Sequence, residues 1–115
     1  MSEELLVELD NLKTAEKPII VEGKKDKEAL KKVSIYCVFT IKEPLFKLCE
    51  NISKKYKDVI ILTDLDKEGK RLYSKLKENF ERNGVKVNDR FREFLFKETT
   101  LRQIEGLNKY IENTQ

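Results

Sequence analysis

Apolar residues along this chain follow two spacings, one typical of helices and one typical of short buried strands. Four short runs rich in β-branched residues predict strands, at residues 19–21, 35–39, 59–62 and 85–87. Apolar residues three or four apart predict five amphipathic helices. Two cover residues 3–12 and 26–33, a third begins at Pro44, a fourth follows the strand at 59–62 and ends near residue 82, and the last buries Ile104, Leu107 and Ile111.

Local signals place some helix ends. Gly84 is a natural stop for the helix that runs to about residue 82. Thr100 and Gln103 have the spacing of a capping box, which predicts that the last helix begins there. Residues 91–96 fit either apolar period, so the pattern leaves their structure open.

The alternation of short strands with helix-length segments predicts an α/β fold. We expect a mostly parallel four-stranded sheet flanked by helices, with right-handed crossovers. A length of 115 residues suits a single domain. We predict an N-terminal amphipathic helix over residues 1–17, a central α/β domain over 18–98 and a C-terminal helix over 99–115.

Composition narrows the function without naming it. The chain has 24 Lys and Arg against 21 Asp and Glu, and a net charge of +3 is too small to indicate nucleic-acid binding by itself. The chain has no His, which excludes Ser–His and Cys–His catalytic schemes. Cys37 and Cys49 lie within apolar patterns, so we expect reduced, buried thiols rather than a zinc site.

No secretory signal or apolar run long enough to cross a membrane is evident in the sequence. We therefore expect a cytoplasmic protein with no membrane partner. The sequence does not define its oligomeric state.

Two acidic motifs follow predicted strands directly. Residues 22–26 read EGKKD and residues 64–69 read DLDKEG. Asp64 and Asp66 lie two apart on an extended segment, so their side chains point the same way. Carboxylates that close repel one another unless a cation lies between them. Because Mg²⁺ prefers oxygen ligands, we predict a metal site formed by Asp64, Asp66 and Glu22.

Other residues of the two motifs suit phosphate binding. Gly23 and Gly69 allow close backbone approach. Four cations lie within reach of the motifs and are expected to contact phosphate or nucleic acid, namely Lys24, Lys25, Lys70 and Arg71. In an alternative interpretation, Asp66 and Asp26 are only the N-caps of the helices that follow, and the lysines only a solvated face.

These motifs resemble those of the Toprim domain. That pattern is a strand followed by Glu-Gly, and later a strand followed by D-x-D-x-x-G, which residues 19–23 and 61–69 match; Asp26 extends the match. The domain is shared by type IA and type II topoisomerases, bacterial-type primases, OLD-family nucleases, recombination mediator proteins and ribosomal-RNA maturation nucleases. The chain most resembles the short stand-alone archaeal Toprim proteins.

The resemblance implies a Toprim-like, Rossmann-like sheet and assigns roles. Glu22 matches the catalytic general acid/base, which also ligates metal. Asp64 and Asp66 match the pair that coordinates Mg²⁺, with Asp64 bridging two ions, and Gly23 and Gly69 match the motif glycines. The cofactor implied is one or two Mg²⁺ ions, for which Mn²⁺ would substitute.

Two functions from different classes stay open on the sequence. The first is Mg²⁺-dependent phosphoryl transfer on nucleic acid, as in a nuclease, with RNA or DNA undetermined. The second is a non-catalytic assembly module that binds a protein partner, for which Phe91, Phe94 and Phe96 would form a contact surface if they are not core residues. A haloacid dehalogenase-type phosphatase or a receiver domain fits less well, because the acidic motif of each follows the first strand.

Overall fold

Helices and strands alternate along the computed structural model, which describes residues 3–113. The elements are α1 (Glu3–Thr14), β1 (Ile19–Val21), α2 (Lys24–Lys31), β2 (Val38–Thr40), α3 (Leu45–Ser53), β3 (Asp58–Ile61), α4 (Lys67–Arg82), β4 (Lys86–Asn88), α5 (Arg90–Glu98), the short 3-10 helix η1 (Ile104–Gly106) and α6 (Leu107–Asn113).

The four strands form one sheet in the order β2-β1-β3-β4, and all three pairings are parallel. The predicted fold class is therefore confirmed. From β1 the chain moves outward to β2 on one side, whereas from β3 it moves outward to β4 on the other side. The strand order thus reverses between β1 and β3, and ligands of open α/β sheets bind beyond the carboxyl ends of the strands at such a point.

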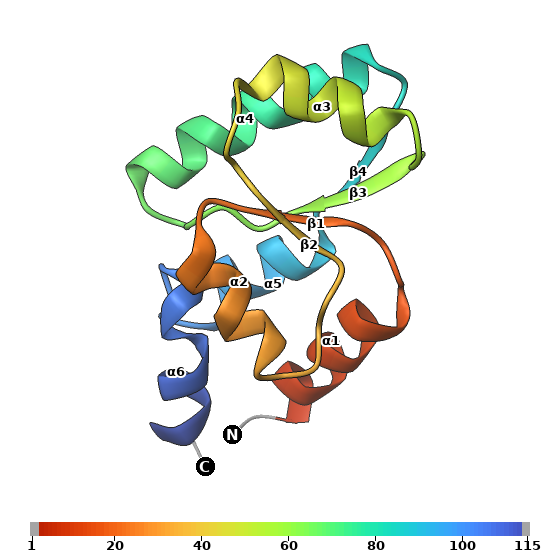
Figure 1. Ribbon diagram of the computed structural model, residues 1–115. Coiled ribbons are helices and arrows are strands. Elements are labelled where there is room, and N and C mark those ends of the chain that lie inside the picture. The colour runs from red at the N-terminus through yellow and green to blue at the C-terminus, as the bar shows by residue number, and fades with distance from the viewer. Residues whose placement is uncertain (1–2, 114–115) are drawn as a thin grey trace.

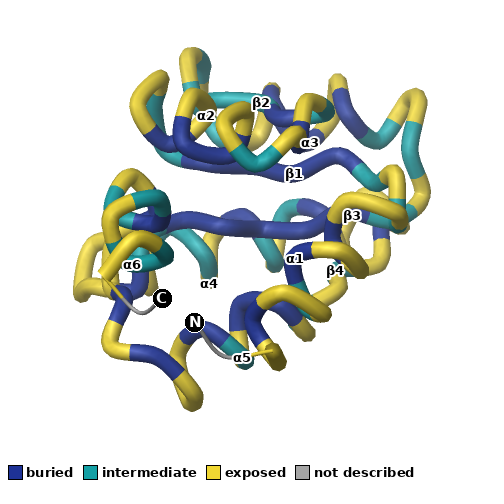
Figure 2. The backbone as a smooth tube through the Cα atoms, turned by 90° about the horizontal axis from the view of Figure 1, so that it is seen from below, coloured by how far each residue is buried: buried dark blue, intermediate teal, exposed yellow. Residues whose placement is uncertain are grey.

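Helices cover both faces of the sheet (Figure 1). α3 and α4 lie on one face, and α1, α2, α5 and α6 lie on the other. The strand side chains alternate between the two cores: Ile20 and Ile61 pack with α3 and α4, while Ile19 and Ile60 pack with the opposite layer. Burial on both sides explains why the strands read as continuous apolar runs, and the tube of Figure 2 is buried along β1 and β3.

Some strand and helix ends differ from the predicted ones by a few residues, because turns at helix ends take up part of the predicted strand. The second strand begins at Val38 rather than residue 35, because the backbone N–H groups of Val33 and Ile35 both bond the carbonyl oxygen of Leu30 at the end of α2. Ser34, with a φ of 66°, makes the turn between them. Gly84 does end α4, and its φ of +77° is one that glycine adopts without strain.

The capping box predicted at Thr100 and the alternative assignment of Asp26 as an N-cap are both wrong. Gly23 is the N-cap of α2, and Asp26 lies in the first turn, where its Oδ2 accepts a hydrogen bond from the Gly23 N–H at 3.1 Å. Thr100 and Gln103 form no capping box, because residues 99–103 are not helical and α6 begins only at Leu107. The backbone of this segment bonds the acidic loop instead, since the Arg102 carbonyl accepts from the Leu65 N–H at 2.7 Å.

The segment with two possible periods is helix α5, and its aromatic residues divide between core and surface. Phe91 is buried, Phe94 is half-buried and Phe96 is 43% exposed.

Cys49 is buried as expected, and burial raises the pKa of its thiol to about 12, whereas Cys37 is only half-buried. Within residues 3–113, helices are too short or too polar to cross a membrane.

Candidate metal site

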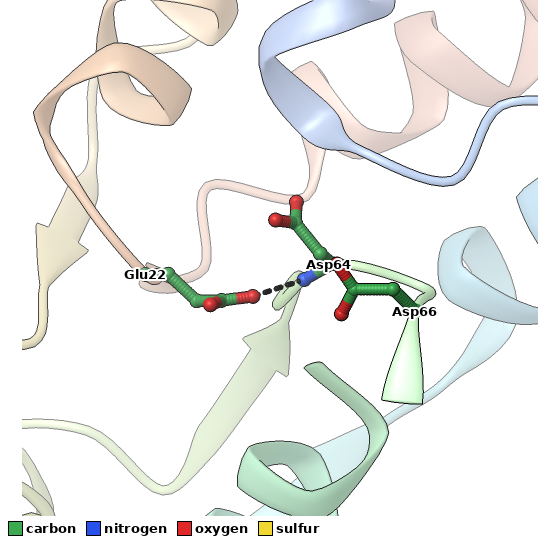
Figure 3. Close-up of side chains that lie close together, drawn as sticks. All are labelled: Glu22, Asp64 and Asp66. Carbon is green, nitrogen blue, oxygen red and sulfur yellow. Dashed lines mark hydrogen bonds between the residues drawn. The ribbon is translucent and has the colours of Figure 1, made fainter. Parts of the chain in front are cut away.

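The two acidic motifs meet at the point where the strand order reverses. β1 and β3 are neighbours, with Ile20 opposite Ile61, so the residues that follow the two strands leave the same edge of the sheet. Glu22 Oε2 accepts a hydrogen bond from the backbone N–H of Asp64 at 2.7 Å, across 42 residues of sequence (Figure 3). This bond ties the first motif to the second.

The structure gathers the three predicted carboxylates into one cluster. One oxygen from each of Glu22, Asp64 and Asp66 lies within 4.8 Å of the others. Figure 3 shows the three side chains converging from the ends of β1 and β3 and from the loop that precedes α4. Glu22 and Asp64 are half-buried and Asp66 is exposed, so the cluster opens to solvent on one side.

Each carboxylate is held in place through one of its two oxygens. Asp64 Oδ1 accepts from the backbone N–H of Ile104 at 2.9 Å, and Asp66 Oδ1 accepts from that of Gly69 at 2.8 Å. Asp66 is therefore both the N-cap of α4 and a member of the cluster. Within residues 3–113, the second oxygen of Glu22, Asp64 and Asp66 has no hydrogen bond. The arrangement is ordered and retains three acceptor oxygens.

The loop between β3 and α4 is closed tightly at Gly69. The buried Thr63 hydroxyl donates to the Gly69 carbonyl at 2.7 Å. A Cβ on Gly69 would overlap the carbonyl oxygen, carbonyl carbon and Cα of Asp64, all within 3.0 Å. A Cβ on Gly23 would meet no atom within 4 Å. The crowding therefore occurs at Gly69, where it sets the path of the loop that carries Asp64.

Arg92 supports the backbone of the acidic loop, and the sequence pattern did not identify it. Its side chain is 7% exposed, and its guanidinium donates to the carbonyl of Thr63 and, at 3.0 Å, to that of Asp64. The same group lies 4.6 Å from the ring centroid of Tyr73. Arg92 lies in the run with two possible periods, so only the choice of a helix would have placed it beside Phe91 and Leu95 on the inner face.

We predict that Arg92→Met lowers the free energy of unfolding by about 3 kcal/mol, because two carbonyl groups at the start of the acidic loop lose their donor. Metal affinity should fall as well, since Asp64 loses its backbone support. Urea denaturation and a Mg²⁺ titration measure the two effects. Arg82→Met, which removes an exposed cation near the end of α4, is the control. Equal stability of the two variants would contradict this role for Arg92.

Negative charge is crowded at the cluster. Burial is the main cause that raises the pKa of Glu22, and the nearby Asp64, Asp66 and Asp26 raise it further, against the lowering effect of the bond from the Asp64 N–H. The pKa of Asp64 is likewise raised by burial and then by Asp66 and Glu105. Ordered oxygen ligands whose charges repel one another fit a hard divalent cation such as Mg²⁺.

The predicted phosphate contacts lie at the starts of two helices. Lys24 and Lys25 are exposed in the first turn of α2, Lys70 is exposed in the first turn of α4, and Arg71 is exposed just after it. Arg71 is bound by both oxygens of Glu68, at 2.9 and 2.5 Å, so much of its charge is compensated. Contact of these four side chains with phosphate stays a prediction.

The sequence pattern of the Toprim domain matches residues 17–95, so the chain belongs to the Toprim domain family. Several of its relatives are small archaeal proteins called UPF0292. The one from Methanocaldococcus jannaschii is 39% identical over 116 residues, which span 95% of this chain and 91% of that protein. The one from Pyrococcus abyssi is 37% identical over 101 residues, which span 86% and 75%.

Solved structures agree with the sequence match. A protein from Aquifex aeolicus superposes with a TM-score of 0.83 at 36% identity, over 90% of this chain and 98% of that one. The zinc-binding and RNA polymerase domains of the Aquifex aeolicus primase superpose with a TM-score of 0.58 at 23% identity, over 91% of this chain and 27% of the primase chain. The likeness to the primase shows a shared fold.

Proposed function

We propose that the cluster binds Mg²⁺ and that the protein catalyses Mg²⁺-dependent phosphoryl transfer on nucleic acid, as a nuclease does. The observation that carries this proposal is the convergence of three carboxylates, each oriented by a backbone hydrogen bond and each contributing an oxygen within 4.8 Å of the others. Membership of the Toprim family, which is linked to nucleic-acid metabolism, supports the choice of substrate class.

Glu22, Asp64 and Asp66 would hold one or two ions, with Mn²⁺ as a substitute for Mg²⁺. When bound, the ion supplies a Lewis acid that polarises a phosphate group and lowers the pKa of a water molecule. Asp64 and Asp66 keep their outer oxygens available because Ile104 and Gly69 hold the inner ones.

Glu22 is the residue that we propose moves a proton. Its Oε2 is held by the Asp64 N–H, and Oε1, when it is not bound to the ion, would take a proton from the attacking water or return one to the leaving oxygen. In the metal-free protein, burial and the neighbouring carboxylates raise the pKa of Glu22, which brings its proton exchange closer to neutral pH. Lys24 and Lys25 would hold phosphate oxygens beside it, and Lys70 those of an adjoining phosphate.

Cleavage of end-labelled RNA and DNA, single-stranded and duplex, tests the proposal with Mg²⁺, Mn²⁺ or a chelator present. We expect metal-dependent cleavage that Glu22→Gln slows by about 10²- to 10⁴-fold. The Gln side chain can still accept from the Asp64 N–H, so the fold should persist. Glu28→Gln, an exposed change on α2, is the matched control.

Absence of cleavage on every substrate, or cleavage by Glu22→Gln at the wild-type rate, would contradict the proposal. The first of these results would favour the alternative, a non-catalytic module for assembly in nucleic-acid metabolism.

A further inference from the structure

A cationic cluster built on one aromatic ring lies beside the acidic loop. Phe96, on α5, is 43% exposed. Lys70 Nζ lies 4.7 Å and the guanidinium carbon of Arg102 lies 5.0 Å from its ring centroid. The three residues come from α4, from α5 and from the segment before η1, and contact with the ring orients both cations.

The charges of these two cations are not neutralised. Within residues 3–113, neither Lys70 nor Arg102 has a carboxylate oxygen within 4.0 Å, whereas Arg71, Lys77 and Arg90 each do. Arg102 Nη1 donates to the carbonyls of Thr99 and Leu101, at 3.1 and 2.8 Å, which fixes the side chain but leaves its positive charge. Two ordered, uncompensated cations favour an anion.

Backbone contacts place both cations next to the metal site. The Lys70 N–H bonds the carbonyl of Asp66 at 2.9 Å, one helical turn away. The Arg102 carbonyl accepts from the N–H of Leu65, the residue between Asp64 and Asp66. Both residues are therefore anchored to the acidic loop, and their side chains would suit a phosphate adjoining the reacting one.

A hollow of about 230 Å³, lined in part by Lys70 and Phe96, lies between α4 and α5. Leu65, Tyr73 and Phe96 give it apolar and aromatic walls, and Lys97 and Glu93 contribute polar groups. The negative charge of Glu93 disfavours a phosphate within the hollow. A flat heterocycle suits these walls, because aromatic side chains stack on bases and polar groups bond base edges.

We propose that Lys70, Arg102 and Phe96 form a nucleotide subsite for single-stranded nucleic acid. The two cations hold a backbone phosphate, and the adjacent base enters the hollow beside Phe96 and Tyr73. Because a base in a duplex is already stacked and paired, the subsite selects single strands. This inference rests on the proposed function and specifies the substrate class. RNA and DNA share the chemistry required.

Fluorescence anisotropy tests the subsite, with short labelled RNA and DNA and a chelator present so that no cleavage occurs. We expect Phe96→Ala and Arg102→Gln each to weaken single-strand binding roughly tenfold. Arg82→Gln removes an exposed cation at the far end of α4 and should change binding less than roughly twofold. Duplex of the same sequence should bind more weakly and be insensitive to Phe96→Ala. The RNA and DNA arms show which strand is preferred.

Phe96→Leu keeps an apolar side chain without the ring and should also weaken binding, which separates stacking from general packing. Thermal unfolding should show that these exposed changes leave the protein folded. Wild-type affinity in Phe96→Ala and Arg102→Gln, or no binding of any single strand by the wild type, would overturn the subsite. Cleavage that needs Mg²⁺ and Glu22 would then still uphold the proposed function. Conversely, binding that depends on Phe96 without any cleavage would uphold the subsite and contradict catalysis.

Discussion

Asp64→Asn should abolish the response of thermal stability to Mg²⁺ and, at neutral pH, raise the melting temperature of the metal-free protein. Both effects come from one carboxylate. The negative charge of Asp64 is needed to bind a cation. In the absence of a cation this charge is unfavourable, because Asp64 is half-buried beside Asp66 and near Glu22 and Glu105. Asn keeps an oxygen that can accept from the Ile104 N–H, so the fold loses no hydrogen bond there.

The metal effect is the larger of the two. A ligand that binds only the folded state at 100 times its Kd stabilises it by about 2.7 kcal/mol. For a chain of this length, that raises the melting temperature by about 11 °C. Loss of one of three carboxylates should weaken Mg²⁺ binding by about 100-fold or more, so the same Mg²⁺ concentration should barely move the Asn variant.

The pH dependence of the metal-free protein has a definite sign. Since the folded state raises the pKa of Asp64 above its ordinary value of 3.8, the folded state binds this proton more tightly than the unfolded state. Wild-type stability should therefore fall as pH rises from 3.8 through the raised pKa, and then level off. The advantage of Asp64→Asn should be absent well below pH 3.8 and full above the raised pKa.

Thermal unfolding across this pH range, with Mg²⁺ or a chelator, measures both effects. Asp10→Asn, an exposed change on α1, provides the control and should behave as the wild type does. A metal-free Asn variant that is less stable than the wild type at pH 7 would contradict the electrostatic argument. A Mg²⁺ response equal to that of the wild type would contradict the metal site.

Gly69→Ala should cost about 3 kcal/mol of unfolding free energy, because its Cβ would overlap the backbone of Asp64. The direction is opposite to helix propensity, since Ala is favoured over Gly by about 1 kcal/mol within a helix. The loop must shift to accept the methyl group, which disturbs the hydrogen bonds from Gly69 N–H to Asp66 and from Thr63 to the Gly69 carbonyl. Mg²⁺ affinity should therefore fall too.

Urea denaturation in the presence of a chelator measures the stability cost without the contribution of bound metal. Gly23→Ala is the matched control, since a Cβ there meets no atom within 4 Å and the backbone is extended. If the two Ala variants are equally stable, the close approach at Gly69 does not set the path of the loop.

The acidic cluster could be predicted because its members follow strands directly. Parallel strands leave the same edge of a sheet, so the strand assignments alone place Glu22 and Asp64 at one edge. The supporting contacts could not be predicted in this way. Arg92 reaches the Asp64 carbonyl across 28 residues, and Ile104 reaches the Asp64 carboxylate across 40. Neither contact leaves a local pattern, because each depends on how α5 and the segment after it pack.

The wrong caps have a related cause. Cap preferences describe which side chain can satisfy free N–H groups at the start of a helix, and they assume that no better partner is near. The backbone that follows Thr100 has such partners. The Arg102 carbonyl accepts from the Leu65 N–H, and the Ile104 N–H donates to the Asp64 carboxylate. Tertiary hydrogen bonds thus decide where the last helix begins. The division of the chain at residues 17/18 and 98/99 stays a prediction.

The use of one oxygen of each carboxylate for a backbone hydrogen bond bears on how related sequences are interpreted. Asn or Gln at positions 22, 64 and 66 could make the same three bonds and preserve the loop. These amides carry no negative charge, however, and so would not attract a cation. A relative that had become a scaffold protein would tolerate these amides, whereas an enzyme would not. Under the proposed function, an acid-to-amide exchange at these positions, rather than loss of the motif, would mark the relatives that lack catalysis.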